Sequence, residues 1–63
     1  MYKIEIWRYH NVIETYENED AKNVLDWYME NYHWNYEYGG CTYYLFKDDV
    51  ELTWKESHEL GFD

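Results

Sequence analysis

Fifteen aromatic side chains have to stabilise a chain of only 63 residues, and this requirement limits what the chain can fold into. Small scaffolds usually need disulfides, a metal, oligomerisation or a dense core. The single cysteine, Cys41, excludes an internal disulfide and fits a reducing compartment. Each aromatic side chain buries about 150–250 Å², so we expect one domain, residues 1–63, whose surplus aromatic side chains contact partners.

Hydrophobic periodicity predicts two hairpins around one helix. Alternation of period two, with β-branched and aromatic residues, predicts strands at residues 2–9, 12–16, 41–47 and 50–55. Turns are expected at His10-Asn11 and at Asp48-Asp49. In the first strand, Tyr2, Ile4 and Ile6 form one face, while the other face consists of Lys3, Glu5 and Trp7.

A helix is predicted from about residue 21 to about residue 36. Five apolar residues with helical spacing form its core stripe: Ala21, Val24, Leu25, Tyr28 and Tyr32. Asn18 or Asp20 is a candidate cap, and Gly39-Gly40 is expected to end the helix. Gly61 argues against a long helix at residues 56–63, whose structure the pattern leaves open.

These elements predict an α+β fold of the order ββαββ. It consists of an antiparallel sheet of about four strands with one helix packed across one face. The other face of such a sheet can remain open to solvent.

The predicted helix carries a second aromatic stripe. Trp27, Trp34 and Tyr38 share a face about 120° from the core stripe. Because one helix on one sheet buries one stripe, something else has to cover the second. Three occupants are compatible with the sequence: Leu60 and Phe62 of the same chain, a second copy in a homodimer, or a target protein.

Fourteen carboxylates against five Lys and Arg give a net charge of −9. This charge argues against direct binding of nucleic acid or an anionic membrane and favours a basic protein partner. Three groups of acidic residues are candidate contacts: Glu14, Glu17, Glu19 and Asp20; Asp48 and Asp49, with Glu51 in the same cluster; and Asp26 and Glu30, with Glu37 on the same helix face. On a rigid surface these carboxylates could imitate the phosphates of a nucleic acid, or they could only solubilise the chain.

Catalysis has little support in the sequence. His10, His33 and His58 are scattered without metal-ligand spacing, and Cys41 has no partner in a nucleophile motif. We therefore expect no enzyme, no metal and no cofactor. A nucleotide-binding module remains a third alternative, which would need Lys3, Arg8, Lys47 and Lys55 to converge.

No secretory signal or membrane span is visible, so a cytoplasmic location is expected.

The chain resembles small acidic accessory proteins of bacteriophages through its Tyr- and Trp-rich acidic segments at residues 25–32 and 43–49. The resemblance covers the whole chain by composition and contains no specific motif. It implies an inhibitor of a basic, nucleic-acid-handling host protein, such as a restriction nuclease, a CRISPR effector or RNA polymerase. The alternative is a small homo-oligomeric subunit with an aromatic interface.

Overall fold

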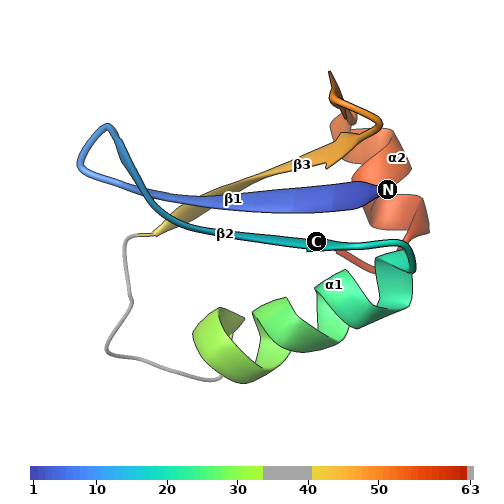
Figure 1. The fold of residues 1–63 in the computed structure, drawn as a ribbon, viewed down its shortest axis with the longest axis horizontal. Helices are drawn as coiled ribbons and strands as arrows, with labels where there is room; N and C mark the ends of the chain where they lie inside the picture. Colours follow the sequence, from blue (N-terminus) through green and yellow to red (C-terminus); the bar gives the residue numbers. More distant parts are fainter. Residues whose placement is uncertain (34–40, 63) are drawn as a thin grey trace.

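A computed structural model describes residues 1–33 and 41–62 as an α+β fold (Figure 1). Its elements in chain order are β1 (Tyr2–Arg8), β2 (Asn11–Asn18), α1 (Ala21–Tyr28), η1 (Met29–His33), β3 (Thr42–Lys47), β4 (Val50–Glu51) and α2 (Trp54–Glu59). The strands form one antiparallel sheet in the order β2-β1-β3-β4. This arrangement confirms the predicted fold class.

Both hairpins close through two-residue turns. Tyr9 and His10 have φ values of 52° and 68°, and Asp48 and Asp49 have φ values of 50° and 67°. Two successive positive φ values characterise the type I′ turn, whose twist matches that of paired strands. The first turn therefore lies one residue earlier than predicted, and β2 is longer than residues 12–16.

The core joins both hairpins, the helix and the C-terminal segment. Its buried side chains are Ile4, Ile6, Val24, Leu45 and Phe62. Burial of Ile4 and Ile6 confirms the predicted inner face of the first strand. Half-buried Tyr and Leu side chains, among them Leu25, Tyr28 and Tyr32 of the predicted core stripe, pack around this cluster.

Asp20, one of the two candidate caps, begins α1, because its side chain accepts a hydrogen bond of 2.9 Å from the Lys22 backbone N–H. The helix then widens into the π-helical η1. The Asn31 side-chain amide donates to the Trp27 carbonyl at 2.8 Å, where an α-helix would place a backbone N–H. Residues 34–40 lie outside the described part, and so does the predicted end at Gly39-Gly40.

The predicted fourth strand is wrong in its extent, because β4 has only two residues and α2 begins at Trp54. A capping box explains the change. The Thr53 hydroxyl accepts from the Glu56 N–H at 3.2 Å, while the Glu56 carboxylate accepts from the Thr53 N–H at 3.0 Å. These two bonds satisfy two backbone donors at the N-terminal end of α2.

The segment after α2 forms a Schellman motif. The Phe62 N–H donates to Ser57 and the Gly61 N–H donates to His58, both at 3.0 Å. Gly61 has a φ of 103°, and a Cβ there would lie 3.0 Å from the Leu25 side chain, so any other residue at this position would be strained. The motif turns Phe62 into the core.

Candidate binding surface on the open sheet face

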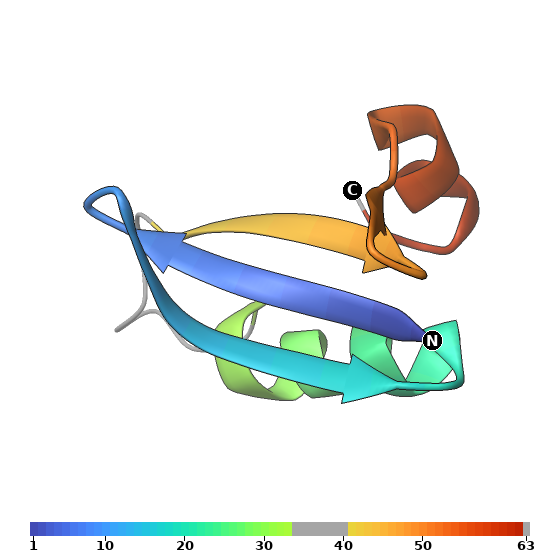
Figure 2. The same cartoon turned by 45° about the horizontal axis from the view of Figure 1, so that its top comes forward.

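Among the described residues, α1 packs on only one side of the sheet, and we call the opposite side the open face (Figure 2). Its side chains follow from the strand register. Glu5 of β1 pairs with Tyr44 of β3, and Lys3 pairs with Phe46. These residues alternate with the buried Ile4 and Leu45, so they lie on the outer side of the sheet.

A hollow of about 350 Å³ lies on this face. We call it the open-face hollow, and its lining residues are Glu5, Trp7, His10, Tyr44, Phe46 and Glu51. The Trp7 and Tyr44 rings meet edge to face, with centroids 5.8 Å apart and planes at 79°. The hollow therefore combines aromatic walls with two carboxylates.

The two carboxylates have different surroundings. Glu5 is half-buried. Its carboxylate accepts a hydrogen bond of 3.2 Å from the Trp7 indole N–H and forms an ion pair of 3.6 Å with the Lys3 ammonium. The Lys3 ammonium also lies 4.8 Å from the centre of the Phe46 ring. Glu51 is exposed and belongs to neither ion pair found in residues 1–33 and 41–62. It carries the free negative charge of the hollow.

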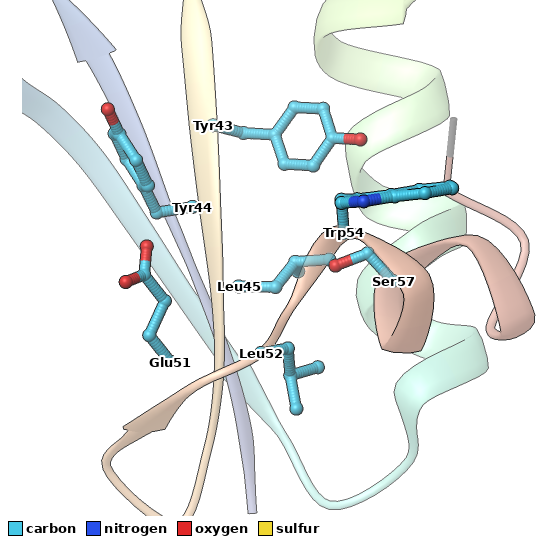
Figure 3. A pocket seen from close by; sticks show the side chains of 7 residues that line it. All are labelled: Tyr43, Tyr44, Leu45, Glu51, Leu52, Trp54 and Ser57. Atoms are coloured by element: carbon cyan, nitrogen blue, oxygen red, sulfur yellow. The ribbon is translucent and has the colours of Figure 1, made fainter.

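A second concavity follows the outer edge of β3, where the short β4 ends. This edge groove has a volume of about 280 Å³ and is lined by Tyr43, Tyr44, Leu45, Glu51, Leu52, Trp54 and Ser57. Figure 3 shows Tyr43 and Leu45 on the same side of β3 as Trp54, and Tyr44 and Glu51 on the other side. Because Tyr44 and Glu51 line both concavities, the hollow and the groove form a continuous surface.

The structure divides the first predicted acidic group between the two sheet faces. Glu14 pairs with the buried Ile6 and accepts a hydrogen bond from the Tyr32 hydroxyl, so it lies on the helix side. Glu17 pairs with Lys3 and lies on the open face. Successive side chains of a strand point to opposite faces, so Glu14 and Glu17, which are three residues apart, lie on different sides of the sheet.

Besides Glu14, two more of the predicted acidic contacts have structural partners. Asp20 caps α1. The Asp48 carboxylate forms an ion pair with the Met1 ammonium, which donates a hydrogen bond of 2.7 Å to it. This hydrogen bond, together with the ammonium charge, lowers the pKa of the Asp48 carboxyl. The other predicted acidic contacts are exposed side chains at Glu19, Asp26, Glu30 and Asp49, and Glu37 lies outside the described residues.

The predicted aromatic stripe is described only at Trp27. This residue is half-buried, and its ring stacks on Tyr16 of β2 with centroids 4.9 Å apart and planes at 4°. Its indole thus covers the sheet within the same chain. Trp34 and Tyr38 lie outside the described residues. Phe62 contacts Tyr28 and Tyr43, on the core side of the helix.

Sequence reasoning missed Trp7, Tyr44, Phe46 and Trp54 as candidate contacts. The outward position of Trp7 was predicted from alternation, but the register that brings Tyr44 beside it requires the pairing of β1 with β3. Trp54 is 81% exposed and was assigned to a strand. The capping-box pattern of Thr53 and Glu56 was the signal that could have placed it at a helix start.

No three His, Cys, Asp or Glu residues come together as metal ligands in the described part of the chain. Burial, and secondarily Cys41, raises the pKa of the Tyr28 hydroxyl, which keeps that group protonated at neutral pH. Within the same residues, no helix has the length and apolar character needed to cross a membrane.

Comparison of the chain with protein-family models, curated proteins and solved structures gave no match. The physical features of the surface are therefore the basis for a functional proposal.

Proposed function

We propose that this chain is a non-catalytic binding protein that docks its open sheet face on a basic protein in the cytoplasm. The partner is a protein that handles nucleic acid, and docking blocks its nucleic-acid groove, as an inhibitor of the phage accessory type would do. The chain offers carboxylates in place of phosphates and aromatic side chains in place of bases.

One observation carries this proposal: among the residues that the structure describes, most carboxylates have no ion-pair partner. Twelve of the fourteen carboxylates belong to these residues, and two of the twelve form ion pairs, Asp48 with the Met1 ammonium and Glu5 with Lys3. The remaining acidic side chains are available to steer a basic partner and to pair with it. Their repulsion of phosphate groups disfavours direct binding to nucleic acid.

The aromatic hollow adds a contact area to this charge. Protein interfaces favour Trp and Tyr at their centres, surrounded by polar rims. Glu5 and Glu51 line the same hollow as Trp7 and Tyr44, and Glu17 lies on the same face beside Lys3. This combination supports docking through the open face, with the helix side serving as the scaffold.

Affinity capture from bacterial lysate, followed by competition, tests the proposal. The immobilised protein is expected to retain a basic nucleic-acid-binding protein, which duplex DNA or RNA releases. The complex should weaken strongly between low and physiological ionic strength. A retained partner that nucleic acid does not displace would contradict the blocking role.

Self-association is the second candidate function, and the exposure of Trp54 favours it. Trp54 is 81% exposed and Val50 is 68% exposed beside the edge groove. If a homodimer forms there, its dimerisation affinity should not depend on salt and should be lower in the Trp54→Ala variant. Sedimentation of the wild type and of Trp54→Ala at low and physiological ionic strength distinguishes self-association from docking on a basic protein.

A further inference from the structure

We propose that the open-face hollow is a recognition site for one arginine side chain of the basic partner. This inference rests on the proposed function and names the group that the surface reads. A guanidinium group stacks on aromatic rings and pairs with carboxylates through its planar set of N–H donors. The hollow presents both kinds of partner, with Trp7 and Tyr44 as rings and Glu51 as the exposed carboxylate.

The walls of the hollow are positioned before any ligand arrives. The Trp7 indole N–H donates to the Glu5 carboxylate at 3.2 Å, which holds the orientation of the indole ring. The edge-to-face contact with Tyr44 holds the second ring. A preset site loses less side-chain entropy on binding than one whose rings have to be ordered.

The same face already binds a cation of the chain itself. The Lys3 ammonium lies between the Glu5 carboxylate, at 3.6 Å, and the Phe46 ring, at 4.8 Å. Lys3 does not line the hollow, so its position leaves the Trp7 side of the surface accessible. The pairing of a carboxylate with a ring around Lys3 is the arrangement that Glu51 and Tyr44 offer to a second cation.

Charge and size favour arginine over a neutral or an anionic ligand. The hollow has two carboxylates, of which only Glu5 has an ion-pair partner in the described residues. Its volume of about 350 Å³ exceeds what one flat guanidinium group and its aliphatic stem require, so a single side chain can enter without displacing a ring. An anionic ligand would meet Glu5, Glu51 and a net charge of −9.

Titration with three short peptides tests the inference. The peptides are identical except for a central arginine, citrulline or lysine, and citrulline keeps the shape of arginine without its charge. The Trp7 indole N–H resonance is the readout. The arginine peptide is expected to shift this resonance and to bind more tightly than the lysine peptide, and the citrulline peptide should leave it unchanged. Equal shifts with arginine and citrulline, or tighter binding of lysine, would overturn the assignment.

Two matched variants locate the site. Glu51→Gln keeps the side-chain shape and should weaken binding of the arginine peptide about two- to fivefold, the range for an exposed ion pair. Glu30→Gln removes the same charge from the helix side and should leave the affinity unchanged. Equal effects of the two variants would show a general charge effect and refute a specific hollow.

The same measurements separate this inference from the proposed function. A basic partner that still binds Glu51→Gln with unchanged affinity, and that nucleic acid still displaces, would refute the arginine site alone. Arginine-specific binding in the hollow, combined with a partner that nucleic acid does not displace, would refute the blocking function alone.

Discussion

Phe62 is a core residue because the local backbone turns it inward. Its side chain is 2% exposed and its ring contacts Tyr28 and Tyr43. No periodic pattern marks it, since it follows Gly61 in a segment whose helical and irregular alternatives are both compatible with the sequence. Its burial depends on the left-handed conformation of Gly61.

Phe62→Ala should therefore destabilise the protein by about 3–5 kcal/mol, the usual range for a buried phenylalanine. Urea unfolding followed by circular dichroism measures the free energy. Trp54→Ala is the control, because Trp54 is 81% exposed and its loss should change stability by less than about 0.5 kcal/mol. A Phe62→Ala variant that unfolds together with the wild type would disprove the core position.

Asp48 links the first residue to the second turn. Its hydrogen bond to the Met1 ammonium lowers the pKa of the carboxyl in the folded state. The stabilisation is therefore present above the unfolded-state pKa and is lost as the pH falls through the folded-state pKa. Asp48→Asn preserves a residue that tolerates positive φ, so it changes the charge and little of the turn.

The pH dependence should distinguish Asp48 from its neighbour. At neutral pH, Asp48→Asn should melt at a lower temperature than Asp49→Asn, which removes the same charge from the same turn without this ion pair. The difference between the two variants should vanish in strong acid. A gap in melting temperature that persists at low pH would rule out the ion pair as its source.

The elements differ in how far the sequence predicts them. β1 and α1 were predicted well, because alternation of Ile4 and Ile6 and the spacing of Val24 and Tyr28 report burial directly. The turn at Tyr9 was displaced by one residue, since neither Tyr nor His signals positive φ as Asn-Gly would. Strand pairing, which creates the hollow, depends on contacts distant in sequence.

The second helix was missed because two local signals conflict at one position. Val50, Leu52 and Trp54 alternate like a strand, whereas Thr53 and Glu56 form a capping box.

Thr53→Ala should remove the cap and cost about 1 kcal/mol of stability. Lys55→Ala is the exposed control in the same helix. Differential scanning calorimetry should show a lower melting temperature for Thr53→Ala alone; equal values would mean that the cap contributes nothing.

The whole molecule uses its two sheet faces differently. The helix side holds the core, and the open side holds rings and carboxylates that the core does not need. The predicted acidic and aromatic sites were chosen from sequence clusters, and folding redistributes them. Glu14 and Glu17 separate between the faces, while Trp27 stacks on Tyr16. The composition predicts that aromatic and acidic side chains lie on the surface, and the register of the strands determines which face each of them occupies.

Mapping of a bound basic polypeptide by amide and indole chemical shifts tests the open face most directly. An arginine-rich peptide added to labelled protein should perturb the signals of Trp7, Tyr44 and Phe46 and leave those of α1 unchanged. Added salt should reduce these shifts in proportion to the loss of binding. Perturbations centred on α1, or on Trp54 without Trp7, would contradict the assignment of the open face as the binding surface.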